Sequence, residues 1–144
     1  MPLVILFCCL LVVVTTVLHY EVLRCINTWL PTLKVPDRAK LIVVILAAFV
    51  AHATEMAVYG ATLYALIVRG GAGTLHGNPE FTLMACMYFS AETYTSLGFG
   101  DLTPNGPIRL LAAVEALNGL LLIGWSASFI YISMEKFWRE ALPK

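Results

Sequence analysis

Thr95-Ser96-Leu97-Gly98-Phe99-Gly100-Asp101 is the stretch of sequence on which the interpretation of the whole chain depends. Gly98 and Gly100 alternate with larger residues, and glycine adopts positive φ angles at no steric cost. A backbone that alternates in handedness turns successive carbonyl oxygens toward one side. The stretch therefore predicts a loop that offers a row of carbonyl oxygens, and its surroundings decide where that loop lies.

The chain has the composition of an integral membrane protein. Of its 144 residues, 60% are hydrophobic and 12% are charged, and the mean hydropathy is +0.83. A soluble domain carries about 25% charged residues, so much of this surface faces something other than water. The formal net charge of zero argues against a nucleic-acid partner. A non-helical loop at membrane depth must be buried in protein or line a watery path.

Residues 1–24 are almost continuously apolar and predict an N-terminal transmembrane helix. A signal peptide is the alternative, but no basic region precedes the apolar run and no small-residue cleavage site follows it. Residues 25–40 are interrupted by Pro31 and Pro36 and carry Trp29, a ring of the kind that lies at headgroup level. They predict an interfacial loop on the cytoplasmic side.

Two further long apolar segments flank a short one. Residues 41–68 would form a helix of roughly 40 Å, which is longer than the hydrocarbon core, so it should tilt or protrude. Residues 81–95 are helix-compatible, with Asn78 and Pro79 placed to start the helix, yet they are too few to cross a bilayer. A re-entrant helix is expected there, and residues 107–136 are expected to form the last spanning helix.

The distribution of basic residues predicts the orientation, because cytoplasmic segments carry an excess of lysine and arginine. One side would hold two basic residues, Arg69 and Arg109, and the other would hold seven: Arg24, Lys34, Arg38, Lys40, Lys136, Arg139 and Lys144. This count places the N-terminus outside, the C-terminus in the cytoplasm and residues 95–101 at the outer side.

Residues 88–101, Tyr-Phe-Ser-Ala-Glu-Thr-Tyr-Thr-Ser-Leu-Gly-Phe-Gly-Asp, resemble the pore helix and selectivity filter of tetrameric potassium channels of the minimal bacterial type. The two leading aromatics, Glu92, and Asp101 after the last filter glycine all match this family. The resemblance covers roughly residues 38–138. It implies an all-α membrane protein in which one extra transmembrane helix precedes a pore domain, residues 41–138, made of an outer helix, a re-entrant pore helix, a filter loop and an inner helix.

The resemblance also implies which residues contact the transported ion, K⁺. Backbone carbonyls would replace its water along the filter, residues 96–101, and the carbonyls belong to Ser96, Leu97, Gly98, Phe99 and Gly100. Thr95, Glu92 and Asp101 would support this loop. Glu92 and Asp101 should share a proton or be bridged by water, with one pKa raised; in the alternative, Glu92 only caps or hydrogen-bonds locally.

One filter loop cannot enclose an ion, so the resemblance implies a homotetramer, with three identical subunits around each chain. The expected setting is the lipid bilayer of the cell (inner or plasma) membrane, which the chain crosses several times. No organic cofactor is implied.

Three residues depart from the usual filter pattern: Ser96 replaces threonine, Leu97 replaces valine or isoleucine, and Phe99 replaces tyrosine. Each leaves the row of carbonyls available, so potassium selectivity is predicted. A non-selective monovalent cation channel on the same scaffold is one alternative, and a non-conducting auxiliary membrane protein is another. An enzyme is not expected, because the chain lacks the patterns of a helical zinc protease, a Ser/His/Asp triad or a phosphate loop.

Gly119 lies in the last helix where this family commonly has a hinge glycine. A glycine costs a helix about 1 kcal/mol relative to alanine, so it usually has a bending or a packing reason. Steps of four from Gly119 predict Ile123, Ala127 and Tyr131 as pore-lining positions.

Several ionisable side chains within the apolar segments are not explained by the resemblance. Such groups are costly inside a membrane and tend to pair. His52 and Glu55 share one helix face, and further groups lie on the first and last helices: His19, Glu21 and Glu115. One interpretation is a metal or proton site, although zinc needs three or four converging ligands. The other is a hydrogen-bonded cluster that joins the first helix to the pore domain.

The four cysteines lie in or beside apolar segments: Cys8, Cys9, Cys25 and Cys86. Their spacing fits neither a metal site nor a disulfide framework, so we expect them to be buried as small hydrophobic residues.

Overall fold

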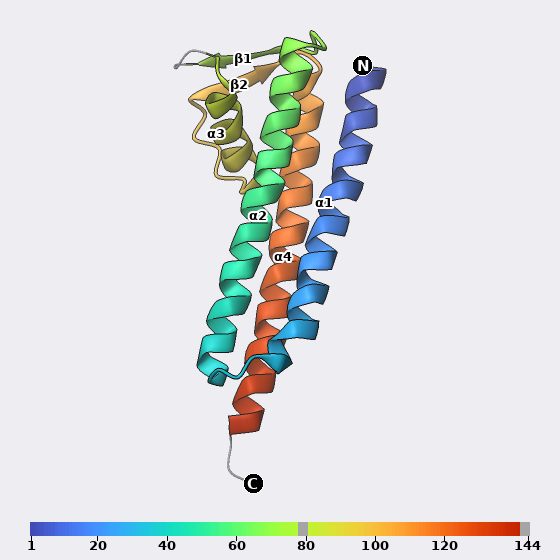
Figure 1. Cartoon of the computed structure of the whole chain (residues 1–144). Coiled ribbons are helices and arrows are strands. Elements are labelled where there is room, and N and C mark those ends of the chain that lie inside the picture. Colours follow the sequence, from blue (N-terminus) through green and yellow to red (C-terminus); the bar gives the residue numbers. More distant parts are fainter. Residues whose placement is uncertain (78–80, 142–144) are drawn as a thin grey trace.

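The computed structural model describes residues 1–77 and 81–141 of the chain (Figure 1). Three long helices run side by side: α1 (Pro2–Trp29), α2 (Asp37–Val68) and α4 (Ile108–Ala141). Each contains a stretch that is long and apolar enough to cross a membrane. The N-terminus and the end of α4 lie at opposite ends of the bundle. This architecture confirms the predicted class, a mostly helical membrane protein.

The connection between α1 and α2 is shorter than the sequence predicts. α1 continues through residues 25–29, the 3₁₀ helix η1 follows at Leu30–Thr32, and α2 already begins at Asp37. The expected helix end at residue 24 and the expected loop 25–40 therefore differ from the structure. The physical reason is continued packing along one face of α1 and η1 against α2, made by Leu23, Ile26, Leu30 and Val44.

The short helix α3 (Leu83–Tyr94) packs against α2 and α4 at the end of the bundle that holds the N-terminus (Figure 1). Thr82 caps it, because the Thr82 side-chain oxygen accepts a hydrogen bond from the Ala85 N–H at 3.1 Å. The predicted helix start at Asn78 and Pro79 lies outside the described residues. With 12 residues, α3 reaches about 18 Å, which is too short to span a bilayer.

Two short strands, β1 (Thr74–Gly77) and β2 (Leu102–Asn105), pair in antiparallel fashion, which the sequence does not predict. Close approach of the two backbones explains the pair. A Cβ atom at Gly73 or Gly77 would collide with a backbone carbonyl oxygen of the partner segment. The strands therefore tie the chain before α3 to the chain that follows residues 95–101.

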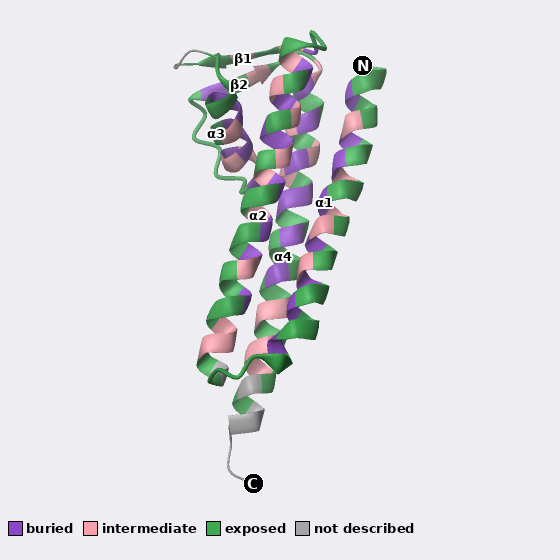
Figure 2. Ribbon diagram, in the orientation of Figure 1, coloured by how far each residue is buried: buried purple, intermediate pink, exposed green. Residues whose placement is uncertain are grey.

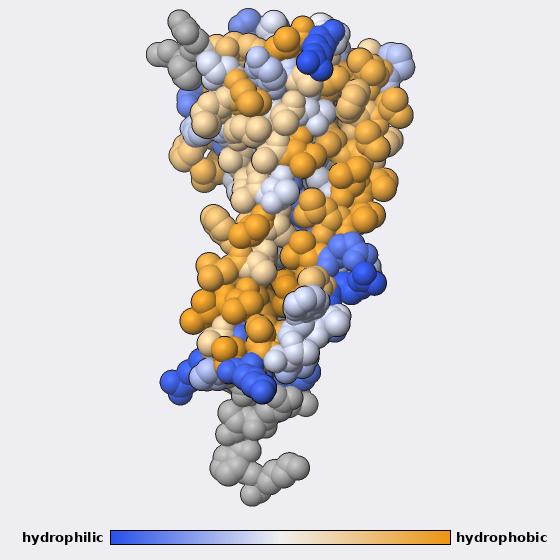
Figure 3. All heavy atoms as spheres, in the orientation of Figure 1, coloured by the Kyte–Doolittle hydropathy of each residue, from blue (hydrophilic) through white to orange (hydrophobic). Residues whose placement is uncertain are grey.

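Buried side chains line the contacts between the helices, and the outward faces carry many exposed apolar residues (Figure 2). On the face shown in Figure 3, hydrophobic residues cover much of the bundle, and hydrophilic residues gather at its two ends and in one patch on the right-hand side near mid-height. This distribution fits a belt of lipid around the helices. Cys8 and Cys86 are buried as predicted, whereas Cys9 and Cys25 are exposed.

Candidate functional site

Residues 95–101 leave the end of α3 as an irregular loop that leads back to β2 (Figure 1). Every second residue has a positive φ angle: Ser96 at 57°, Gly98 at 55° and Gly100 at 80°. The glycines adopt this conformation freely, but Ser96 is the only non-glycine residue with a positive φ in the described part of the chain. The alternation thus begins at Ser96, two residues before the first of the two glycines. All seven residues of the loop are exposed in the single chain.

Glu92 of α3 holds this loop through three successive amides. The N–H groups of Leu97 and Gly98 donate to the Glu92 carbonyl oxygen at 2.9 and 3.2 Å. The Phe99 N–H donates to the Glu92 carboxylate Oε2 at 3.2 Å. The Glu92 residue is only 4% exposed, so it holds the loop from its buried side, whereas all seven loop residues are exposed in the single chain.

Asp101, at the far end of the loop, has a different contact. The Tyr88 hydroxyl donates to Asp101 Oδ1 at 3.4 Å, and the described hydrogen bonds include none between Asp101 and Glu92. Burial raises the pKa of the Glu92 carboxyl, the Phe99 N–H lowers it in part, and the charge of Asp101 raises it further. The two carboxylates are therefore coupled by charge and not by a direct hydrogen bond.

A second group of polar side chains lies between the helices, and we call it the His19–Glu55 cluster. It contains one residue of α1, two of α2, the last residue of α3 and one of α4: His19, His52, Glu55, Tyr94 and Ser126. His19 and Glu55 are completely buried, and the His52 side chain is 16% exposed. Four helices thus meet in one set of hydrogen bonds.

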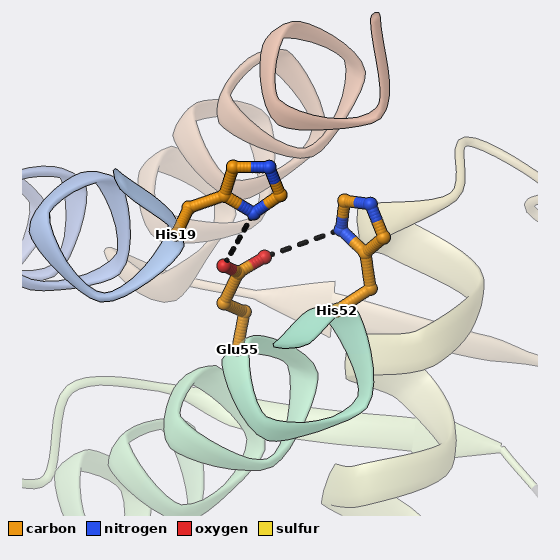
Figure 4. Close-up of side chains that lie close together, drawn as sticks. All are labelled: His19, His52 and Glu55. Carbon is orange, nitrogen blue, oxygen red and sulfur yellow. Dashed lines mark hydrogen bonds and ion pairs between the residues drawn. The ribbon is translucent and has the colours of Figure 1, made fainter. Parts of the chain in front are cut away.

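Glu55 lies at the centre of this cluster (Figure 4). Glu55 Oε1 is 2.9 Å from His19 Nδ1, and Glu55 Oε2 is 3.2 Å from His52 Nδ1. The Tyr94 hydroxyl donates to Glu55 Oε2 and lies 2.9 Å from His52 Nδ1. Ser126 Oγ contacts the other nitrogen of both rings, at 3.1 Å from His19 Nε2 and 3.0 Å from His52 Nε2.

A known sequence family described as an ion channel matches residues 39–136, which contain α3, the loop 95–101 and most of α2 and α4. The chain belongs to this ion channel family. The voltage-gated potassium channel regulatory subunits KCNG1 of Homo sapiens and of Mus musculus are each 31% identical to the chain over 65 residues. That match covers 44% of this chain and 13% of each relative. No solved structure matches the chain.

The region that matches the ion channel family begins after α1. Tyr94, Ser126 and both α2 members of the His19–Glu55 cluster lie inside the match, whereas His19 lies outside it. The cluster therefore joins the additional helix to the channel segment. A second polar contact does the same, because Asn118 Nδ2 of α4 donates to Thr15 Oγ1 of α1 at 2.8 Å.

Two residues that the sequence associates with the histidines lie elsewhere in the channel. Glu21 is exposed and pairs with Arg24 at 2.8 Å on the same helix. Glu115 is buried and accepts a hydrogen bond from Ser90 of α3. Among the hydrogen bonds and ion pairs of the described residues, none joins Glu21 or Glu115 to His19 or Glu55.

Sequence reasoning missed two members of the cluster, Tyr94 and Ser126. Ser126 could have been identified from its spacing along α4. It lies on the same buried helix face as Glu115 and Asn118. Tyr94 gives no comparable signal, because its direction depends on how α3 is seated against α2.

Gly119 of α4 is buried where the helix passes the end of α3. A Cβ atom there would collide with the Tyr94 carbonyl oxygen, so the absent side chain permits close packing. The role of Gly119 as a hinge stays a prediction. The predicted pore-lining residues further along α4 are all exposed in the single chain: Ile123, Ala127 and Tyr131.

Proposed function

We propose that this ion channel conducts K⁺ selectively and passively, through a pore that four copies of the chain form together. The loop 95–101 of each copy would supply the backbone carbonyls that replace the water of the ion, from Ser96 to Gly100. K⁺ is then the transported ion, and the coordinating groups are carbonyl dipoles that bind it without holding it permanently.

The observation that carries the proposal is the backbone of this loop. Its φ angles are positive at alternate residues, and Glu92 secures three of its amides from behind. The loop is nevertheless exposed in the single chain. Because unpaired backbone is not tolerated against lipid, the exposed side must be covered by protein or face a watery path, and the proposal is that it faces a watery path. Further copies of the chain would enclose that path.

The proposed orientation places the N-terminus outside the cell membrane and the C-terminus in the cytoplasm. The N-terminus lies at the same end of the bundle as β1, β2 and α3 (Figure 1). Arg69 and Arg109 belong to that end, and the seven other basic residues of the sequence are assigned to the cytoplasmic side. The loop 95–101 would therefore lie toward the outer side.

Reversal potentials of the purified protein in planar bilayers test the selectivity. With K⁺ on one side and an equal concentration of Na⁺ on the other, we expect a large reversal potential at which the K⁺ side is negative. Exchanging the two solutions should reverse its sign. A reversal potential of zero in both arrangements contradicts K⁺ selectivity and favours the non-selective cation channel, to which the departures at Ser96 and Leu97 point. Cross-linking in liposomes should show a four-chain species.

A non-conducting auxiliary subunit is the second candidate function. It is favoured by the name of the similar KCNG1 proteins, which are regulatory subunits of a potassium channel. Under this alternative the purified chain produces no ion flux in liposomes. Thallium or rubidium uptake into liposomes that contain only this chain separates the two functions, because uptake above that of empty liposomes contradicts the auxiliary role.

A further inference from the structure

We propose that the His19–Glu55 cluster is a binding site for a divalent transition-metal ion of the zinc class, and that the ion clamps α1 to the channel segment. Three potential ligand atoms, one each from His19, His52 and Glu55, all lie within 4.8 Å of one another (Figure 4). Imidazole nitrogens and a carboxylate oxygen are ligands that zinc prefers.

The spacing of the ligands suits one ion. Around zinc with bonds of about 2.0–2.1 Å, tetrahedral neighbours lie about 3.3 Å apart. Glu55 Oε1 is 2.9 Å from His19 Nδ1, Glu55 Oε2 is 3.2 Å from His52 Nδ1, and one ligand atom of each residue lies within 4.8 Å of the others, so small shifts of these side chains would place three ligands around the ion. The Tyr94 hydroxyl, 2.9 Å from His52 Nδ1, supplies the fourth ligand.

Ser126 provides the second argument. Both imidazoles direct Nδ1 at Glu55 and Nε2 at the single Ser126 hydroxyl. If both rings are neutral and donate from Nδ1, both Nε2 atoms need a hydrogen from Ser126, which has only one. With a metal on the two Nδ1 atoms, the two Nε2–H groups donate to the two different lone pairs of the Ser126 oxygen, so both nitrogens of each ring have a partner. Metal-bound histidines typically donate their other N–H in this way.

The charges of the proposed ligands also match a divalent ion. The site is buried between membrane-spanning helices, where an uncompensated charge is costly. A divalent ion with the Glu55 carboxylate and a deprotonated Tyr94 phenol is neutral overall. A bound metal promotes this loss of the phenolic proton, as it does for coordinating thiols. Binding therefore releases protons to the solution.

The test uses the full chain in detergent micelles, purified without a polyhistidine tag and freed of metal with a chelator. Titration with Co²⁺ should produce the strong visible absorption of a tetrahedral site, saturating at one ion per chain. Binding of Co²⁺ to the metal-free chain should release protons, and one equivalent of Zn²⁺ should displace the Co²⁺ without further release. Absence of both the absorption and stoichiometric Zn²⁺ retention, measured by elemental analysis, overturns the proposal. In that case hydrogens alone satisfy the contacts of Ser126 with the two rings, either through different tautomers of His19 and His52 or through one additional proton.

Variants locate the site. His19→Ala and His52→Ala should abolish the Co²⁺ absorption, and Ser126→Ala should weaken the affinity by about 10–100-fold, as removal of an outer hydrogen-bond partner does. His76→Ala is the matched control, because His76 is exposed on β1 and contacts Thr74. If His76→Ala removes the metal, or His19→Ala retains it, the assignment is wrong. None of these readouts depends on ion flux, so they stand apart from the proposed K⁺ selectivity.

Discussion

The loop 95–101 and the His19–Glu55 cluster satisfy polar groups in opposite ways. The loop exposes its residues, and its amides from Thr95 to Phe99 are bonded only to α3, the last three of them to Glu92. The cluster buries its side chains, and each has a hydrogen-bond partner within the same chain. Under the proposed tetramer, further copies would complete the loop, whereas the side chains of the cluster find hydrogen-bond partners within a single copy.

This difference separates two tasks that lie close together in the structure. Tyr94 belongs to the cluster, and the next residue, Thr95, begins the loop. Substitutions in the loop should therefore change conduction and leave the folding of each chain nearly intact. Substitutions in the cluster should first lower the stability of each chain.

Gly98→Ala should have the largest effect of the substitutions considered, and the effect should be on K⁺ flux. An added Cβ has open space, but a side chain at a φ of 55° costs about 1–2 kcal/mol in every copy. We expect K⁺ flux in liposomes to fall by about tenfold or more. Gly71→Ala is a matched control, because Gly71 has a φ of 54° and equal open space but lies outside the filter. Equal losses in both variants would contradict a special role of the filter backbone.

Glu55→Ala should destabilise the chain by about 3–5 kcal/mol, because it leaves buried partners without their shared acceptor. Reversible unfolding in mixed micelles measures this change in the free energy of unfolding. The control is Glu21→Ala, which removes an exposed ion pair with Arg24 and should cost at most about 1 kcal/mol. A loss as small in Glu55→Ala as in Glu21→Ala would show that the cluster does not hold α1 in place.

Gly119→Ala should destabilise the chain by about 1–3 kcal/mol through overpacking against Tyr94. Gly124→Ala, where an added Cβ meets no atom within 4 Å, should be neutral or slightly stabilising. Thermal unfolding of both variants checks this difference. A hinge at Gly119 would instead alter the open probability of the channel while stability remains unchanged.

Asp101→Asn should have the smallest effect, a shift in the titration of Glu92. Burial, and to a smaller extent the charge of Asp101, raise the pKa of Glu92, so Glu92 keeps its proton to a higher pH than an ordinary glutamic acid. The contribution of Glu92 to folding stability is therefore complete below its ordinary, unfolded-state pKa. It is lost as the pH rises through the raised pKa of the folded state. Removing the Asp101 charge should lower the midpoint, which infrared carboxyl bands can follow. Asp101→Glu retains the charge and should leave the midpoint nearly unchanged.

Hydrophobicity and local pattern predict the spanning helices and the loop 95–101, because both depend on neighbouring residues in the chain. The long apolar segments predict α1, α2 and α4. The alternating glycines predict that positive φ angles occur at alternate residues of the loop. The strand pair is not predictable in this way, because β1 and β2 are too short to show a period of two and depend on close approach at Gly73 and Gly77.

The candidate polar site is only partly predictable for a related reason. The spacing of His52 and Glu55 on α2 indicates one shared face, but the rotation and depth of α1 and α4 relative to α2 decide which residues join them. The packing of the helices brings His19 and Ser126 to this pair, whereas Glu115 forms its hydrogen bond with Ser90. The continuation of α1 to Trp29 was missed for the same reason, since the contacts of Ile26 and Leu30 lie on α2.

The His19–Glu55 cluster also has a consequence for how the chain is made. His19 and Ser126 are separated by 107 positions, so the ribosome completes α1 long before α4 is synthesised. The cluster partners of His19 belong to α2 and α4, so they are absent while only α1 has been made. In that interval, exposure of the polar ring to lipid is costly. Arrival of Glu55 with α2 supplies the first partner. The insertion machinery would therefore have to release α1 late, or deliver α1 and α2 into the bilayer as a pair.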